Sequence, residues 1–294
     1  MRTLCVLLTL AFTFPVSATD WGHLGDFPCP EVANEERGFG LAWRDSEVFV
    51  ACWNAEATPP WYTNLFVYDE SGNYQGEHFP TELTDIDISG LDWKSDADHG
   101  GMGWYAGGRQ EPTIYLIADD GSSYDSFAGP SNFDRIYGVA HNPDDDMFYT
   151  SDFITGWVGW GDLDGSGAVS SWNQENPGIT YNSMKYVPGT GTDYLFAIYR
   201  GELDTWIHEV HIFSLDGSGV PNDIYVPDQI IDFGNYFYYL GDFDWDGEHM
   251  WLLDQNKGGG DATLDYVAKI ALTGFSPDTN IVPTSLGHIK AQFK

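Results

Sequence analysis

The sequence predicts an all-β protein, and three observations support this fold class. Aromatic residues make up 16% of the chain, and 34 of its 294 residues are glycine. Aromatic side chains favour strands, and glycine favours tight turns. No stretch shows the apolar period of an amphipathic helix. A short motif also recurs along the chain, which indicates a fold built from repeats.

Five copies of this motif anchor the repeats. They lie at residues 40–43 (GLAW), 90–93 (GLDW), 138–141 (GVAH), 183–186 (SMKY) and 242–245 (DFDW). The steps between them are 50, 48, 45 and 59 residues. Each anchor is followed by further β-forming segments, so that one repeat supplies four short strands. Four strands in a repeat of this length are typical of a β-propeller.

We therefore predict a β-propeller with five blades of four antiparallel strands, with six blades as the alternative. The anchors are expected to be the innermost strands, because their glycine and alanine residues suit the crowded centre. Residues 23–28 resemble the fourth strand of a repeat, as at 76–80, yet precede the first anchor. They either close the ring by pairing with the C-terminal strand or belong to an incomplete sixth blade. A β-sandwich would not explain five matching anchors.

The first 18 residues are predicted to be a signal peptide. Arg2 gives a positive start, residues 4–14 are apolar, and residues 15–18 (PVSA) suit cleavage after Ala18. The alternative is a buried N-terminal strand. We therefore expect a secreted, extracellular protein in which residues 19–294 form a single propeller domain. No later apolar stretch is long enough to predict membrane insertion.

The chain is strongly acidic, with 45 Asp and Glu residues against 12 Lys and Arg and a formal net charge of −33. This argues against nucleic acid and anionic membranes as partners, since both require a basic surface. It is compatible with calcium, and no other cofactor is expected. Cys29 and Cys52 remain after cleavage and form either a disulfide or two separate buried thiols. We expect a monomer.

One segment carries a resemblance to known proteins. Residues 244–254, DWDGEHMWLLD, resemble the W-D-G phrase that is common in secreted bacterial β-propellers. The resemblance extends over the repeats and implies architecture, not activity. Five-bladed propellers include lectins of the tachylectin type and glycosidases of the arabinanase and invertase types. No motif in this chain selects one of them.

Two acidic motifs suggest calcium loops. Residues 242–247 have the spacing D-x-D-x-D-G, but the twelfth position of such a loop is Leu253, not a carboxylate. This motif also overlaps an expected innermost strand, so we favour a structural role. Residues 162–167 (DLDGSG) are a second, weaker match. They fall where other repeats have a turn, which suits Asp and Gly.

Functional residues are expected on the loops that join strand 2 to strand 3 and one repeat to the next, because these loops open on one face around a central channel. Four of the five arginines beyond the signal peptide fall there, with several aromatic residues. Arginines suit a carboxylate or phosphate, and aromatic rings suit sugars. The alternatives are internal ion pairs with Glu36, Glu111, Asp134 and Glu202, and simple packing. The candidate ligand-binding residues are Arg37, Trp61, Arg109, Arg135, Asp152, Arg200, Trp206, Tyr236, Tyr238 and Asp254.

Three functions fit this sequence. The first is a non-catalytic binding module for an extracellular glycan, peptide or protein ligand. The second is a glycoside hydrolase-like enzyme with carboxylates in the channel, for which Asp87, Asp152, Glu202 and Asp254 are candidates by position only. The third is a calcium-stabilised scaffold. We favour the first, because no catalytic motif is present, and we assign no catalytic residue.

Overall fold

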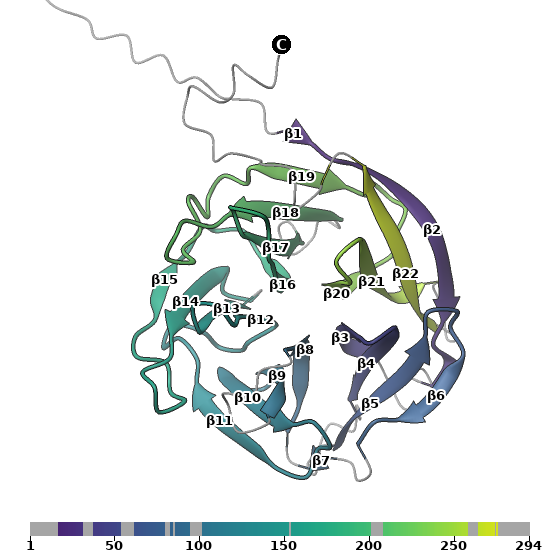
Figure 1. Cartoon of the computed structure of the whole chain (residues 1–294), viewed down its shortest axis with the longest axis horizontal. Helices are drawn as coiled ribbons and strands as arrows, with labels where there is room; N and C mark the ends of the chain where they lie inside the picture. The colour runs from purple at the N-terminus through teal and green to yellow at the C-terminus, as the bar shows by residue number, and fades with distance from the viewer. Residues whose placement is uncertain are drawn as a thin grey trace, which may run out of the picture.

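The computed structural model shows five sheets arranged around a central axis (Figure 1). It describes residues 17–31, 38–53, 62–79, 83–84, 86–94, 102–152, 154–200, 208–257, 264–273 and 275. Each sheet is built on four antiparallel strands, which follow chain order from the axis outward except that the outermost strand of the last sheet comes from the N-terminus; two of the sheets carry a short fifth strand. The prediction of an all-β propeller is confirmed, with five blades and not six.

The blades follow one another along the chain, and each contains one anchor. Blade 1 is formed by β3 (Gly38–Arg44), β4 (Glu47–Trp53), β5 (Tyr62–Asp69) and β6 (Tyr74–Glu77), with the short β7 (Leu83–Thr84) paired to β5. Blade 2 is formed by β8 (Ile88–Trp93), β9 (Met102–Gly108), β10 (Thr113–Ala118) and β11 (Tyr124–Ala128). Blade 3 is formed by β12 (Gly138–Asn142), β13 (Met147–Asp152), β14 (Trp157–Asp162) and β15 (Asn173–Glu175).

The last two blades also take strands from the N-terminus. Blade 4 is formed by β16 (Tyr181–Val187), β17 (Tyr194–Tyr199), β18 (Glu209–Ser214) and β19 (Gln229–Asp232), with β1 (Ser17–Ala18) added in parallel to β19. Blade 5 is formed by β20 (Leu240–Trp245), β21 (His249–Lys257), β22 (Leu264–Thr273) and β2 (Asp20–Pro28).

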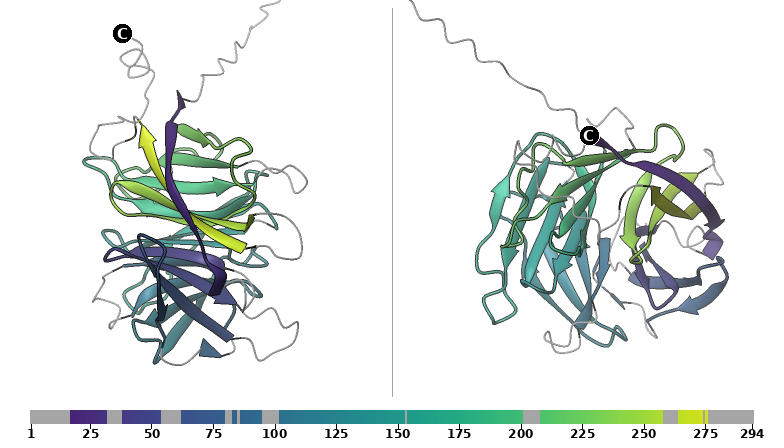
Figure 2. Two further views of the ribbon diagram at one scale, coloured as in Figure 1. Left: turned by 90° about the vertical axis from the view of Figure 1, so that its right-hand side faces the viewer. Right: turned by 45° about the horizontal axis from the view of Figure 1, so that its top comes forward.

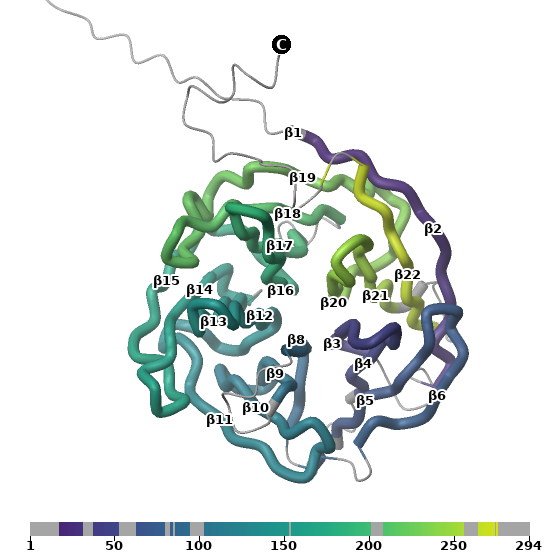
Figure 3. Tube along the Cα trace, viewed as in Figure 1, coloured from purple at the N-terminus to yellow at the C-terminus, as the bar shows by residue number. Residues whose placement is uncertain are grey.

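Strand β2 closes the ring. It pairs antiparallel with β22 from Asp20 opposite Thr273 to Pro28 opposite Tyr266. Figures 2 and 3 show β2, in purple, running along the outside of the yellow β22. The N-terminal strand thus completes the last blade, as residues 23–28 predicted. Cleavage after Ala18 would leave β2 whole and would remove β1.

The signal peptide remains a prediction, because residues 1–16 lie outside the described part of the chain. Within the described residues, no helix has the length and apolar character needed to cross a membrane.

The core consists of five apolar clusters, one at each interface between neighbouring blades. Large aromatic side chains such as Trp104, Tyr149 and Trp251 are fully buried in these layers. A single four-stranded sheet cannot cover both of its faces, and stacking against its neighbours does so. The interfaces are tight near the axis. A Cβ on Gly90 would lie 2.4 Å from the Tyr137 carbonyl oxygen, so this anchor position requires glycine.

The two cysteines lie in the cluster between blades 5 and 1. Cys29 and Cys52 are both buried, and neither forms a disulfide. The structure therefore corresponds to the alternative of two separate thiols. Burial, together with the nearby Asp265 carboxylate, raises the pKa of the Cys29 thiol well above its ordinary value. A thiol of this kind is held in its neutral, unreactive form.

Candidate functional site

The antiparallel order of the strands brings two sets of residues to one end of the propeller. Arg109 and Arg200 directly follow the second strands β9 and β17, while Arg135 and Tyr239 directly precede the inner strands β12 and β20. The start of each inner strand therefore lies beside the end of its second strand. Arg37, Trp61 and Trp206 lie outside the described residues, so the structure places seven of the ten candidates.

Three arginines from three blades meet at this end. We name the arginine cluster the group of Arg109, Arg135 and Arg200 with Asp87, Tyr137 and Tyr239. The arginines have two neighbours in common. Arg200 and Arg109 both act to lower the pKa of the Tyr239 hydroxyl, and Arg109 and Arg135 both act to lower that of the Asp87 carboxyl, so each of these groups lies near two arginines. All three guanidinium-bearing residues are half-buried. Nε and Nη1 of Arg109 are nevertheless buried, so a ligand could reach at most Nη2 of that guanidinium.

Aromatic rings hold the guanidinium groups in place. The Arg109 guanidinium lies 4.2 Å from the centre of the Phe39 ring, and that of Arg200 lies 4.9 Å from the Tyr239 ring. The Arg135 Nη1 donates to the Tyr137 hydroxyl at 3.4 Å. Stacking of this kind fixes the plane of a guanidinium group and leaves its N–H edge able to donate. The cluster thus presents directed donors rather than a diffuse positive charge.

Asp87 lies beneath these arginines. It is 4% exposed, and its carbonyl oxygen accepts a hydrogen bond from the Arg109 backbone N–H at 2.9 Å. Burial raises the pKa of its carboxyl to about 6, against the opposing effects of Arg109, Gln110 and Arg135. Asp87 therefore changes charge in the mildly acidic pH range, close to Arg109 and Arg135.

Two candidate carboxylates fasten the loops of this face. One oxygen of Asp152 accepts the Asp134 backbone N–H at 2.7 Å, and the other accepts that of Ile154 at 2.8 Å. Asp254 holds the corresponding loop of blade 5, where its Oδ1 accepts the backbone N–H groups of Tyr238 and Tyr239 at 2.8 and 2.9 Å. Both carboxylates thus fix the backbone of the loops that carry Arg135 and Tyr239. Glu202 lies outside the described residues.

The structure separates the two candidate tyrosines from the cluster. Tyr236 is 46% exposed, and its ring packs 5.3 Å from Trp21 and 5.2 Å from His23, both on the outer strand β2. Tyr238 is 52% exposed. It is Tyr239, one position further, that lies against Arg200. Sequence reasoning placed Tyr239 on the correct loop but did not select it, because only the course of the loop decides which tyrosine turns inward.

A second polar group lies deeper, on the axis itself. We name the axial network the group of Asp92, Lys185, Asp242 and Asp244, which come from the inner strands of blades 2, 4 and 5. All four side chains are nearly or fully buried. The Lys185 ammonium donates to the Leu91 carbonyl oxygen and lies 3.6 Å from Asp92 Oδ1. Sequence analysis singled out Asp242 and Asp244 only as part of the 242–247 motif and did not connect them with Asp92 or Lys185.

The axial carboxylates accept hydrogen bonds from backbone N–H groups of other blades. Asp242 Oδ2 accepts the Leu41 N–H at 2.7 Å, and Asp244 Oδ2 accepts the Trp43 N–H at 2.7 Å. Asp92 Oδ2 accepts the His141 N–H at 2.9 Å. The innermost strand of a blade has one edge without a neighbouring strand, and buried N–H groups need partners. The carboxylates supply these partners and tie the blades together.

Burial and charge set the ionisation of the network. Desolvation raises the pKa of Asp242 to about 6 and also raises that of Asp244, with Lys185 opposing both. The pKa of Asp92 is lowered, because Lys94 and Lys185 outweigh its burial. Lys185 itself keeps a raised pKa, since the three carboxylates compensate for the loss of water. The lysine therefore acts as the internal counter-ion of the axis.

The D-x-D-x-D-G motif does not converge on one point. Asp242 and Asp244 point to the axis, whereas Asp246 accepts the His249 N–H at 2.6 Å and the Trp251 indole N–H at 2.9 Å in the following hairpin. Among the described residues, no group of three or more His, Cys, Asp and Glu side chains is arranged to hold a metal ion.

Comparison with known proteins concerns the fold. No family model and no curated protein sequence matches the chain. Among solved structures, the exo-β-1,3-galactanase of Phanerochaete chrysosporium with galactose is similar at 12% identity and a TM-score of 0.53, over 78% of this chain and 58% of the other. A luciferin-regenerating enzyme is similar at 10% identity and a TM-score of 0.50, over 88% and 98%.

The WD40 domain of Pan2 from Neurospora crassa is a more distant match, at 14% identity and a TM-score of 0.40, over 81% of this chain and 64% of the other. At such identities only the architecture is shared. The chain is a five-bladed β-propeller of repeats.

Proposed function

We propose that this protein is a secreted, non-catalytic binding module, and that the arginine cluster binds an anionic group of an extracellular glycan. The observation that carries the proposal is the meeting of Arg109, Arg135 and Arg200, from three different blades, in a chain with a net charge of −33. Guanidinium groups suit carboxylates because they donate two parallel hydrogen bonds. Nucleic acid is not the expected ligand, because the large net negative charge of the protein repels its phosphates.

The glycan is favoured over other anions by Tyr239. Its ring packs against the Arg200 guanidinium and is partly exposed, whereas Tyr137 is 7% exposed and holds Arg135 through its hydroxyl. Aromatic rings contact the apolar faces of sugars, while arginines take their carboxylates. A uronic acid combines both chemistries in one residue. An acidic peptide or a protein surface would use the arginines alone.

The test is a calorimetric titration with two matched ligands, trigalacturonic acid and the neutral galactotriose. We expect saturable binding of the acidic trimer, weakened by added salt, and at least about tenfold weaker binding of the neutral one, because each charge-assisted contact is worth about 1.4 kcal/mol or more. An acidic peptide of similar charge serves as the third ligand. No binding of the acidic trimer at low salt would overturn the glycan proposal.

The alternative is a glycoside hydrolase-like enzyme, which the raised pKa of Asp242 favours. A general acid needs a carboxyl that stays protonated near neutral pH, and a partner carboxylate is present in Asp244. Against this, both carboxylates accept backbone N–H groups and are buried. Release of reducing sugar from a glycan panel, abolished in Asp242→Asn and retained in Arg109→Gln, would establish the enzyme.

The third candidate, a calcium-stabilised scaffold, makes a separate prediction. A ligand that binds only the folded state raises its melting temperature. A fall in the melting temperature on adding a chelator, reversed by calcium, would favour the scaffold. The binding-module proposal expects no such change.

A further inference from the structure

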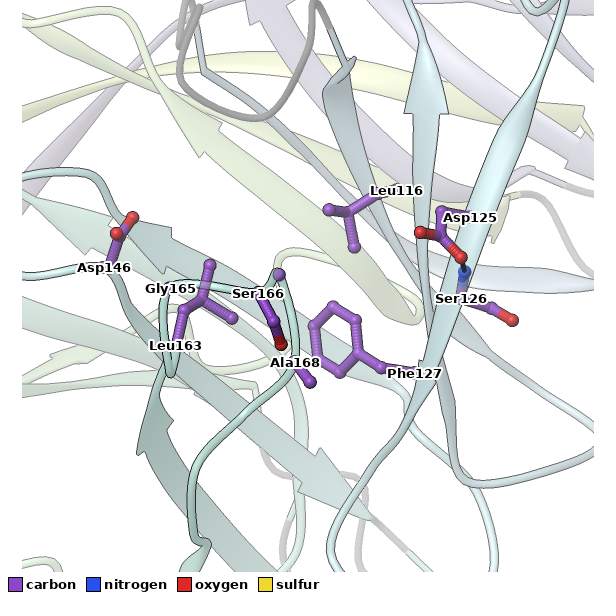
Figure 4. A pocket seen from close by; sticks show the side chains of 10 residues that line it. Leu116, Asp125, Ser126, Phe127, Asp146, Leu163, Gly165, Ser166 and Ala168 are labelled. Atoms are coloured by element: carbon purple, nitrogen blue, oxygen red, sulfur yellow. Dashed lines mark hydrogen bonds between the residues drawn. The ribbon is translucent and has the colours of Figure 1, made fainter.

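A pocket of about 420 Å³ lies between blades 2 and 3, away from the arginine cluster (Figure 4). Blade 2 contributes residues of β10 and β11. Blade 3 contributes the turn between β12 and β13 and the loop between β14 and β15. Both of these connections lie at the end of blade 3 opposite to the arginine cluster, because adjacent strands run antiparallel. The pocket therefore belongs to a different face of the molecule.

One wall of the pocket is apolar. It is formed by Leu116 and Phe127 from blade 2 and by Leu163 and Ala168 from blade 3. The Phe127 ring packs edge-on against Phe148, with the ring centres 5.3 Å apart. Figure 4 shows the same ring extending towards Ala168 across the opening. An alkyl chain or ring that entered the pocket would therefore find hydrocarbon on both sides.

The polar lining side chains are two carboxylates and two serine hydroxyls. Asp125 and Asp146 stand at opposite ends of the pocket in Figure 4. Asp125 caps the next backbone N–H at 2.8 Å, and Asp146 Oδ1 lies 3.5 Å from the buried His141 Nε2. The segments 124–128, 142–147 and 162–170 contain six aspartates and no lysine or arginine. The local potential is therefore negative from every side of the opening.

The loop over the pocket is built independently of any ligand. The Asp164 N–H donates to the Ala168 carbonyl at 2.8 Å, and the Asp164 carboxylate accepts the Ser166 N–H at 2.8 Å. Gly165 and Gly167 have φ of 82° and 89°, which only glycine adopts readily. The Leu163 N–H bonds the Asp146 carbonyl at 3.3 Å. The walls are thus set before binding.

We propose that this pocket binds a lysine or arginine side chain of a partner polypeptide. The apolar wall suits the hydrocarbon stem of such a side chain, and the Phe127 ring and the two carboxylates suit its cationic end. Charge complementarity selects this occupant over an acidic or neutral one, because every charge around the opening is negative. This proposal is independent of the function of the arginine cluster.

The test uses nuclear magnetic resonance of the isotope-labelled protein with acetyl-Leu-Arg-amide and with the same peptide carrying citrulline, which is neutral and nearly isosteric. We expect the arginine peptide to shift the backbone signals of Ser126, Gly165 and Ala168 saturably. The citrulline peptide should bind at least about fivefold more weakly, the loss that removal of one partly exposed ion pair produces. Equal shifts with both peptides would overturn the proposal.

Variants distinguish the pocket from general acidity. Asp146→Asn and Asp125→Asn should each weaken binding by about threefold to fivefold. The control Asp20→Asn changes the net charge equally, and Asp20 is an exposed residue of β2 on blade 5. A loss of the same size in Asp20→Asn would show non-specific attraction. N-acetylagmatine, which has the same single guanidinium charge without the leucine residue, should bind more weakly; equal affinity would refute a polypeptide partner.

Discussion

Replacing Lys185 with methionine should destabilise the fold strongly. The Lys185 ammonium is fully buried and is the counter-ion for Asp92, Asp242 and Asp244, while its Nζ also bonds the Leu91 carbonyl. Methionine keeps the length of the side chain and removes the charge. Removing one partner from a buried charged group costs about 3–5 kcal/mol, since the remaining charges stay out of water. For a domain of this size we expect the melting temperature to fall by about 10 °C.

The pH dependence of this loss follows from the carboxyl groups. The folded pKa of Asp242 and of Asp244 is raised above the unfolded value, so folding takes up protons. Stability from Asp242 is present at low pH and is lost as the pH rises through about 6, and stability from Asp244 is lost in the same direction. Without Lys185 both values rise further. The deficit of Lys185→Met should therefore be smaller at about pH 5 than at about pH 7.

Differential scanning calorimetry at the two pH values measures both effects. The control is Lys269→Met, because Lys269 Nζ bonds Glu70 at 2.9 Å and both side chains are partly exposed, at 22% and 39%. A solvent-exposed pair contributes about 1 kcal/mol at most. A Lys185→Met protein that melts within about 2 °C of the Lys269→Met protein would refute the role of the axial network.

Three further outcomes are expected. Affinity for trigalacturonic acid should rise severalfold as the pH falls from about 7 to about 5, because protonation of Asp87 removes a negative charge near the arginines. The Asp87→Asn protein should bind tightly at both pH values. If its affinity depends on pH as that of the unchanged protein does, a group other than Asp87 causes the effect. Gly90→Ala should lower the free energy of unfolding by about 1–3 kcal/mol, because its Cβ meets the Tyr137 carbonyl oxygen. Gly22→Ala should not lower it, because a Cβ there has nothing within 4 Å. Equal denaturant midpoints for the two variants would contradict the tight blade interface. Asp254→Ala should weaken binding without changing the secondary structure, because the loop bearing Tyr239 loses its acceptor, and calorimetry with circular dichroism separates the two effects.

The parts of the fold that the sequence predicted are those with a local signature. The anchors at 40–43 and 138–141 each carry glycine, an apolar residue and alanine at the same positions, and each forms an inner strand. The closing strand was predictable because residues 23–28 resemble a fourth strand that lacks a preceding repeat. The period of the repeats and the pattern of apolar residues within each anchor can both be read along one chain, so a single sequence is enough to predict them.

The site depends on distances that no local pattern contains. Asp92 and Lys185 meet across the axis although 93 positions separate them. The convergence of Arg109 and Arg200 was suggested by topology, but the choice of Tyr239 over Tyr238 depends on the course of one loop. The two thiols could form a disulfide by count alone, and only packing separates them.

The most direct test of the arginine cluster is the affinity of three single variants, Arg109→Gln, Arg135→Gln and Arg200→Gln, for trigalacturonic acid. The control is Arg44→Gln, which removes the same charge from a guanidinium paired with Asp119 at 2.5 Å, at the far end of β3. We predict that each cluster variant weakens binding by about tenfold while Arg44→Gln leaves it within about twofold. Equal affinities for all four variants would contradict the assignment of the binding site.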